Sequence, residues 1–283
     1  MPLDEKKLEF HKQGLSAYEI DRLDLYVNEA KFIYSLIEKE LNVEPINFYE
    51  IGSGIGLLSR MVAEKGHTVI ATEPAASGFG VVKVLQKVIE KSFHTESNVP
   101  VFYSETAEDL FTTLQSKHKE FNYIFCANVV EHVINLPKFF DSVIPLISQN
   151  GTFRFVCPNY AIPYEPHFGF ITLFSKKLTF KFQKRKILEL EKHRKEDLVA
   201  FYNELSFPNV QKINKILKNR NCKITFSRRA TLEYVRRAKN DKIFITRKKI
   251  ITFFVSKSGE LFPFMIKILP TSILPVIDCR IRR

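Results

Sequence analysis

The feature that most constrains the fold is a glycine-rich turn that follows a short apolar run. Residues 46–51 are mostly apolar and stop at Gly52, which opens the sequence Gly52-Ser53-Gly54-Ile55-Gly56. This pattern predicts a buried strand that ends in a sharp turn. A helically spaced segment follows at 57–65 and stops at a glycine. Strand, glycine turn and helix in this order predict an α/β fold.

The same alternation continues along the first half of the chain. Further strands are predicted at 67–72, 99–103, 121–127 and 152–157, and helices at 79–91, 107–116 and 136–148. Right-handed crossovers between such strands give a parallel, doubly wound, Rossmann-like sheet. Ligands bind such sheets at the carboxyl ends of the strands, so the glycine turn is the place where we expect a site.

The pattern divides the chain into five segments. They are an N-terminal helical segment (1–45), a ligand-binding core (46–158), an inserted helical cap over the substrate (159–221), the final strands of the core (222–256) and an apolar C-terminal tail (257–283). Within the fourth segment we predict strands at 222–226 and 250–255. Lys267 and three prolines make the tail a poor membrane-spanning helix. We expect the tail to pack against the protein, with docking on a membrane surface as the alternative.

The net charge of +12 is unevenly placed, with 23 Lys or Arg against 7 Asp or Glu between Lys176 and Lys249. This basic half predicts either a face for an anionic partner, such as a membrane surface, or a set of solvated helix faces. The four cysteines are far apart, which disfavours a zinc cluster or a disulfide framework. With no apolar leader at the N-terminus, we expect a cytoplasmic protein, with a peripheral position on the inner membrane face as an alternative.

The glycine turn distinguishes between two cofactor classes. A dinucleotide site needs G-x-G-x-x-G, but here Leu57 stands at the third glycine position and Gly56 gives G-x-G-x-G. Glu50, two residues before Gly52, would repel a pyrophosphate and would suit a cofactor that carries an ammonium group. The turn therefore favours S-adenosylmethionine over NAD.

Polar residues follow the next two strands. Glu73 ends the second strand, where its carboxylate can accept hydrogen bonds from both ribose hydroxyls. Pro74 either packs on adenine or ends the strand. Thr106 and Ala107 follow the third strand and are placed to meet the adenine edge; alone, they would be an ordinary helix N-terminus capped by Thr106.

These motifs, together with Asn128-Val129-Val130-Glu131-His132-Val133, resemble the class I S-adenosylmethionine-dependent methyltransferases, and within them the ubiquinone-biosynthesis O-methyltransferase type. The resemblance covers residues 47–158. It implies a seven-stranded sheet with a reversed final hairpin. It also implies a cofactor pocket lined by Glu50, Gly52, Gly54, Gly56, Glu73, Thr106, Ala107 and Asn128.

The resembling subgroup carries Glu-x-x-Glu-His after the fourth strand, a set suited to a divalent metal. Here Asn128 stands at the first position and leaves only Glu131 and His132, so we predict no metal site. His132 is a candidate general base for an acceptor hydroxyl. The alternative is a histidine that only orients the loop.

The segment after the fifth strand concentrates aromatic and ionisable side chains between prolines. Tyr160, Tyr164 and Glu165 are predicted to contact the acceptor, and His167 is the second candidate base. Packing alone is the alternative explanation for such a loop. The predicted function is methyl transfer to a nucleophilic atom, an oxygen, of a small-molecule or lipid-like acceptor.

Three other functions are weighed against this one. An RNA methyltransferase would use the basic half to contact phosphates, but Trp is absent and no RNA-binding module is recognisable. A non-catalytic interaction protein would keep the fold without turnover. An NAD-dependent oxidoreductase is disfavoured by Leu57.

Overall fold

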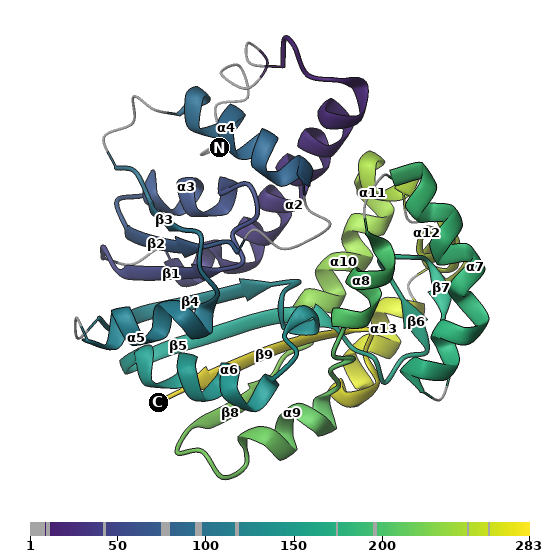
Figure 1. Cartoon of the computed structure of the whole chain (residues 1–283). Helices are drawn as coiled ribbons and strands as arrows, with labels where there is room; N and C mark the ends of the chain where they lie inside the picture. The colour runs from purple at the N-terminus through teal and green to yellow at the C-terminus, as the bar shows by residue number, and fades with distance from the viewer. Residues whose placement is uncertain are drawn as a thin grey trace.

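A seven-stranded sheet in the order β3-β2-β1-β4-β5-β9-β8 organises the molecule (Figure 1). The computed structural model describes residues 9, 12–41, 44–74, 80–93, 98–116, 119–173, 175–194, 197–247, 249–259 and 261–283. The strands are β1 (Asn47–Ile51), β2 (Thr68–Thr72), β3 (Val101–Tyr103), β4 (Phe121–Ala127), β5 (Ile147–Pro158), β8 (Lys223–Phe226) and β9 (Val276–Arg282). Strands β1 to β5 pair in parallel, and β9 runs antiparallel to both of its neighbours. The predicted Rossmann-like sheet with a reversed final hairpin is confirmed.

Helices cover both faces of this sheet because neighbouring residues of each strand point to opposite sides. Phe48 of β1 belongs to a core under α2 (Ala17–Leu41), α3 (Leu57–Ala63) and α4 (Gly80–Ser92). The next residue, Tyr49, belongs to a core under α5 (Ala107–Ser116), α6 (Leu136–Val143) and α9 (Val210–Leu217). The predicted N-terminal helical segment contains α2, and the predicted helices at 57–65, 107–116 and 136–148 correspond to α3, α5 and α6. Helix α6 ends early, and η2 (Ile144–Leu146) follows it. The predicted start of the helix at Phe79 lies outside the described residues.

The chain leaves the sheet after β5 and forms a helical cap. The cap contains the hairpin β6 (Tyr164–Glu165) and β7 (Phe170–Ile171), then α7 (Lys176–Arg194) and α8 (Leu198–Glu204). It has an apolar cluster of its own, which includes Phe168, Ile187 and Tyr202. The cap therefore packs largely on itself and lies beside the sheet (Figure 1).

The prediction of a strand at 250–255 is wrong. Four helices follow β8, namely α10 (Arg229–Asn240), α11 (Lys242–Arg247), α12 (Lys249–Ser258) and α13 (Leu261–Ile268), and the segment lies in α12. A short apolar run does not by itself distinguish a strand from a helix. Here Val255 packs against Val235 and Ile266 in a cluster between helices, so tertiary contacts decide the outcome.

The last strand of the sheet lies in the segment predicted to be an apolar tail. Residues 276–282 form β9, which inserts between β5 and β8. Ile277, Cys279 and Ile281 alternate along it and are buried, so the expected packing of the tail against the protein holds for this part. The division of the core at residue 256 needs correction, because the sheet is complete only at the C-terminus of the chain.

A buried ion pair fastens β9 to the sheet. The Arg154 guanidinium on β5 donates from Nε and Nη2 to the two carboxylate oxygens of Asp278 at 2.9 Å each, and both side chains are 0% exposed. Its Nη1 donates to the Leu36 carbonyl at 2.9 Å and to Glu40 at 2.7 Å, both on α2. One side chain thus joins a central strand, the final strand and the N-terminal helix.

We expect Arg154→Met to lower the free energy of unfolding by about 3–5 kcal/mol, because it leaves the Asp278 carboxylate buried without its cation. The double variant Arg154→Met/Asp278→Leu should recover part of this loss, since it removes both charges. Urea unfolding followed by circular dichroism measures both. A single variant as stable as the unmodified chain would contradict the role given to this pair.

Candidate active site

The glycine turn lies at the carboxyl end of β1. Gly52, Gly54 and Gly56 have φ angles of 73°, 54° and 80°, in the left-handed region that favours glycine. A Cβ on Gly52 would overlap the Val129 side chain, and one on Gly56 would lie 2.7 Å from the Phe102 ring. The turn therefore brings bare backbone close to strand β3 and to the loop that follows β4.

Hydrogen bonds hold the turn against the end of β2. The Gly52 and Ser53 N–H groups donate to the Thr72 carbonyl at 2.8 and 2.9 Å. The Gly54 N–H donates to the Glu73 carboxylate at 2.7 Å. Glu73 is thus fixed at the mouth of the turn, with its other carboxylate oxygen not involved in this bond.

Two carboxylates lie close together here. Glu50 is 6% exposed and accepts a hydrogen bond from the Ser59 hydroxyl. Burial, with a contribution from the nearby Glu73 charge, raises the pKa of Glu50 to about 7. Burial also raises the pKa of Glu73. A cation or a set of hydroxyl donors placed between them would favour their ionised forms.

The remaining predicted cofactor residues follow the ends of β2, β3 and β4. Pro74 comes directly after Glu73. The Thr106 hydroxyl accepts a bond from the Asp109 N–H at 3.1 Å and so caps α5, which begins at Ala107. Asn128 has a φ of 54° and is exposed.

A second group of ionisable side chains follows the end of β5. Glu165 is buried and accepts hydrogen bonds from the Tyr160 hydroxyl at 3.0 Å, His167 Nδ1 at 2.6 Å and the Phe168 N–H at 2.7 Å. Burial alone would raise the pKa of Glu165, but the hydrogen bond and charge of His167, together with the Phe168 N–H, outweigh it and lower the pKa. Glu165 is therefore ionised near neutral pH, and His167 carries a proton on Nδ1. Tyr164 is placed differently, in the β6–β7 hairpin, where it pairs with Ile171.

His167 meets the loop that follows β4. Its Nε2 lies 3.9 Å from Glu131 Oε1, and its ring centroid is 5.2 Å from that of His132. Burial raises the pKa of Glu131 to about 7 and lowers the pKa of His132 to about 3. The fold thus brings both predicted bases to one place.

These three residues also bear on the predicted absence of a metal. One ligand atom from each of Glu131, His132 and His167 lies within 4.8 Å of the others, and the oxygens of Glu131 are buried with no hydrogen-bond partner among the described residues. The sequence motif offers only two of these donors, since Asn128 replaces the third. His167 comes from another loop, so only the fold reveals that the set could hold a divalent cation.

The cap supplies aromatic walls that the sequence analysis missed. The Phe201 ring lies 4.9 Å from His132 and 5.3 Å from His167, centroid to centroid. Phe207 stacks on Tyr160 at 4.3 Å and has a φ of 49°, which is rare for a bulky residue. That unusual backbone is visible only in the structure, whereas the aromatic residues in 198–207 were a readable signal.

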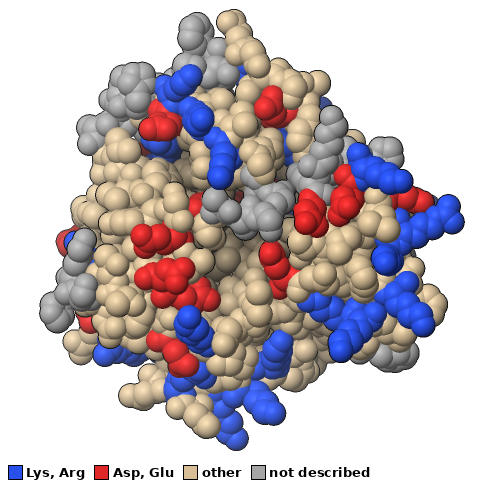
Figure 2. Space-filling view, in the orientation of Figure 1, with Lys and Arg blue, Asp and Glu red and all other residues tan. Residues whose placement is uncertain are grey.

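Charged residues are unevenly distributed over this face of the molecule. Figure 2 shows a hollow near its centre with Asp and Glu side chains around it, while Lys and Arg gather toward the side where α7 lies. The sequence of α7 itself holds eight Lys or Arg and two Glu. The basic half predicted from the sequence is therefore concentrated partly on the cap.

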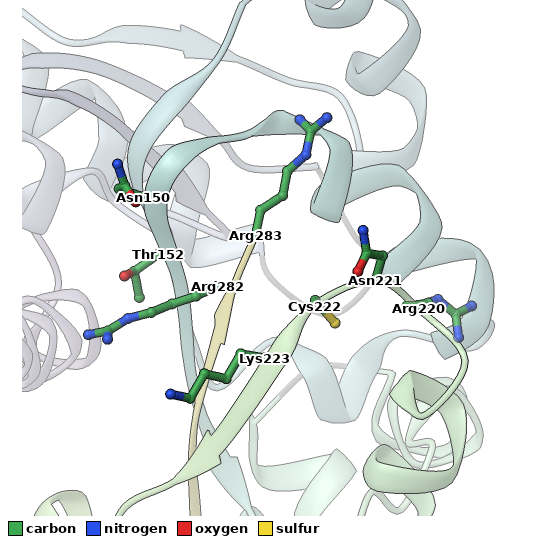
Figure 3. A pocket seen from close by; sticks show the side chains of 8 residues that line it. All are labelled: Asn150, Thr152, Arg220, Asn221, Cys222, Lys223, Arg282 and Arg283. Carbon is green, nitrogen blue, oxygen red and sulfur yellow. The ribbon is translucent and has the colours of Figure 1, made fainter.

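Another depression, of about 670 Å³, lies at the opposite edge of the sheet. Figure 3 shows that Arg282 and Lys223 point one way while Arg220 points the other. Arg220 is bound to Asp141 at 2.8 Å. Because these cations do not converge, this depression is a weaker candidate than the carboxyl ends of the strands.

The fold and the position of the turn are those of class I S-adenosylmethionine-dependent methyltransferases. A family model for the methyltransferase domain matches residues 27–225. The chain belongs to this family, which confirms the predicted class of enzyme and its cofactor, S-adenosylmethionine.

Two individual relatives share about a quarter to a third of their aligned residues with this chain. The chain is 26% identical over 260 residues to an uncharacterized protein of Mycobacterium tuberculosis, which covers 90% of this chain and 85% of the relative. It is 32% identical over 110 residues to a ubiquinone biosynthesis O-methyltransferase of Agrobacterium fabrum, or 38% of this chain and 39% of the relative.

Solved structures give similarities of low identity. Phosphoethanolamine N-methyltransferase 2 of Haemonchus contortus is 13% identical, with a TM-score of 0.45 over 90% of this chain and 51% of that one. A putative sarcosine dimethylglycine methyltransferase of Galdieria sulphuraria is 9% identical, with a TM-score of 0.47 over 90% of this chain and 84% of that one. The assignment to the family rests on the family model.

We expect Glu50→Gln to change how stability depends on pH. The pKa of Glu50 rises from 4.5 to about 7 on folding, so the native state binds more protons than the unfolded state between these values. The contribution of Glu50 to the free energy of unfolding therefore falls as pH rises from 4.5 to about 7, and it no longer changes above that pH. The variant should remove about 2 kcal/mol of the decline between pH 5 and pH 8.

Urea unfolding at several pH values measures this effect. Glu120→Gln is the matched control, because the Glu120 side chain is 54% exposed and lies at the opposite edge of the sheet. Parallel stability profiles for Glu50→Gln and the unmodified chain would show that Glu50 titrates normally.

Proposed function

We propose that this methyltransferase transfers its methyl group to an oxygen of a small-molecule or lipid-like acceptor, with His167 as the general base. The observation that carries the proposal is the bond from His167 Nδ1 to the buried, ionised Glu165 at 2.6 Å. Such a bond fixes the tautomer, leaves Nε2 able to accept a proton and stabilises the imidazolium that forms.

We assign the cofactor to the glycine turn. Glu50 would attract the ammonium group of the cofactor. Glu73, which already accepts a hydrogen bond from the Gly54 N–H at 2.7 Å, would accept hydrogen bonds from the ribose hydroxyls. Pro74, Thr106, Ala107 and Asn128 would then surround its adenine. The support for this assignment is the shared edge of the sheet and the close approach of backbone at Gly52 and Gly56.

We place the acceptor between this turn and the cap. The cofactor supplies an activated methyl group. His167 Nε2 would take the proton of the acceptor hydroxyl as the oxygen accepts the methyl group, and the electron pair of the C–S bond would remain on the sulfur of the bound cofactor. Positioning by Tyr160, Tyr164, Phe201 and Phe207 can contribute about 7–11 kcal/mol, and the base a factor of roughly 10²–10⁴.

His132 suits a different role. Burial lowers its pKa to about 3, so its imidazole is neutral at pH 7 and a poor proton acceptor. It lies against Phe201 and beside His167, where it can orient the acceptor and the base. We therefore propose His132 as a positioning residue.

An RNA acceptor is the second candidate, favoured by the basic α7 on the cap. Contacts to several phosphates would make binding fall steeply with salt concentration. A non-catalytic chain would bind the cofactor and turn over no acceptor.

We expect Glu73→Ala to weaken S-adenosylmethionine binding by about tenfold or more, since it removes charge-assisted hydrogen bonds worth about 1.5–3 kcal/mol each. Calorimetric titration with S-adenosylmethionine, S-adenosylhomocysteine and NAD measures this. Glu120→Ala, at the far edge of the sheet, is the control and should bind normally. Unchanged affinity in Glu73→Ala would remove the ribose assignment.

We expect His167→Ala to lower turnover by about 10²–10⁴ with little change in cofactor affinity. Transfer of a tritiated methyl group from S-adenosylmethionine to fractions of a lipid, quinone or sugar extract measures turnover. Glu165→Gln should lower turnover less and shift its pH dependence, because the amide cannot stabilise the imidazolium. Full activity in both variants would exclude His167 as the base.

A further inference from the structure

The helix α13 exposes its apolar side. Leu261, Phe264, Met265 and Ile268 are 62%, 58%, 38% and 62% exposed. Their spacing of three, one and three residues places them along one stripe of the helix. Only part of the helix faces the protein, where Ile266 is 1% exposed. An apolar stripe that faces solvent over two turns is unusual for a surface helix.

The elements next to α13 also expose apolar and basic residues. Phe253 of α12 is 58% exposed, and Ile273, after α13, is 46% exposed. Lys257 and Lys267 are exposed on the same two helices. From residue 242 to residue 270 the sequence has six Lys or Arg and one Glu. We call the exposed apolar residues and these two lysines the α12–α13 face.

We propose that the α12–α13 face docks on a lipid bilayer that contains anionic phospholipid. Apolar side chains of such a helix enter the boundary between headgroups and acyl chains, while lysines meet the negative surface. The helix lies in the plane of the surface, because eight residues span only about 12 Å and a bilayer core is about 30 Å thick. Among the described residues, no helix is long and apolar enough to cross a membrane.

Charge favours a bilayer over a second copy of the chain. A twofold interface would place this face against itself, so that Lys257 and Lys267 of both copies would lie in one interface. Like charges at an interface core are unfavourable, whereas an anionic surface complements them. The apolar stripe explains the affinity for a bilayer, and the lysines explain the preference for its charge.

The α12–α13 face is linked to the loop after β5, which carries Tyr160 and which we call the acceptor loop. The Asn159 side chain donates to the Ser272 carbonyl at 2.9 Å and the Leu274 carbonyl at 2.7 Å, and its N–H donates to the Pro275 carbonyl at 2.9 Å. Asn159 directly precedes Tyr160 of the acceptor loop. Docking would thus hold that loop near the lipid surface. The inference itself rests on the exposed residues and stands without the proposed function.

The chain contains no tryptophan, which permits a direct test. Phe264→Trp introduces a single fluorophore in the face, and Tyr18→Trp introduces one on α2, where Tyr18 is 41% exposed. With vesicles of 30% phosphatidylserine in phosphatidylcholine, we expect Phe264→Trp emission to shift to the blue and to be quenched by brominated lipid. Tyr18→Trp emission should not change.

Two further variants separate the apolar contribution to vesicle binding from the contribution of the lysines. Phe264→Ser/Ile268→Ser should lower vesicle partitioning by about tenfold for each side chain removed. Lys257→Glu/Lys267→Glu should lower it by at least about fivefold for each lysine on phosphatidylserine vesicles and far less on neutral ones. Val84→Ser/Val101→Ser, which changes exposed residues of α4 and β3, is the matched control and should partition normally.

Three results would overturn the proposal. They are an unchanged Phe264→Trp spectrum with phosphatidylserine vesicles, equal binding to neutral vesicles, and a blue shift that grows with protein concentration in the absence of lipid. The last would identify the face as an interface between copies of the chain. Cofactor titration of Phe264→Ser/Ile268→Ser shows separately that the catalytic domain is folded, so that failure here leaves the methyltransferase assignment untouched.

Discussion

The pairing of Arg154 with Asp278 is the constraint on which the rest of the structure depends. Two charges that are 0% exposed are stabilising only when each satisfies the other, and here the guanidinium forms both bonds at 2.9 Å. Because Asp278 lies on the last strand, the sheet cannot reach its final form until the C-terminal segment has inserted between β5 and β8. Because Arg154 also bonds to α2, the N-terminal helix is held by the same group. The ends of the chain thus depend on one buried cation.

The cost of ionising a buried carboxylate governs the edge of the sheet where the candidate site lies. Glu50 and Glu131 are buried where ionisation is costly, and the pKa of each rises to about 7. Glu165 is also buried, yet its pKa falls because three donors surround it. The difference separates two kinds of carboxylate. Glu165 is already satisfied by the protein and orients a neighbour, whereas Glu50 and Glu131 gain most from a group brought in from outside.

The sequence was sufficient to predict the elements that repeat a pattern. The alternation over residues 46–158 identified β1 to β5 because parallel strands buried on both faces have continuous apolar runs. The run at 250–255 had the same composition but lies in α12, since helices packed around Val235 decide its structure. Strand β9 was not predicted, because Asp278, Arg280 and Arg282 interrupt its apolar residues and the whole segment was assigned to an apolar tail. Its partner, Arg154, is 124 residues away, and no local pattern reports such a contact.

Prediction of the candidate site from the sequence meets the same limit, because contacts between distant segments leave no local pattern. Glu73 could be placed from its position at a strand end, because the ends of parallel strands share one edge, whereas Asn128 was placed through the family resemblance. Proximity of His167 to Glu131 and His132 could not be predicted, since it depends on how the loop after β5 folds back over the loop after β4. The same holds for Phe201 and Phe207, which lie in the cap.

Two helical insertions, one before β8 and one after it, contribute residues near the candidate site. The cap, inserted before α9 and β8, brings Phe201 and Phe207 to the histidines and the acceptor loop. The helices inserted after β8 contact α2, where the Tyr234 ring of α10 lies 4.6 Å from the Phe32 ring, centroid to centroid. Arg237 of α10 is held to Glu29 of α2 at 2.9 Å, and Asp241 to Asn28 at 2.8 Å. Since α2 also lies beside Gly54, through Tyr26, these contacts fix the helix that covers the glycine turn. The sheet is common to the family, so we propose that these two insertions determine which acceptor this chain takes.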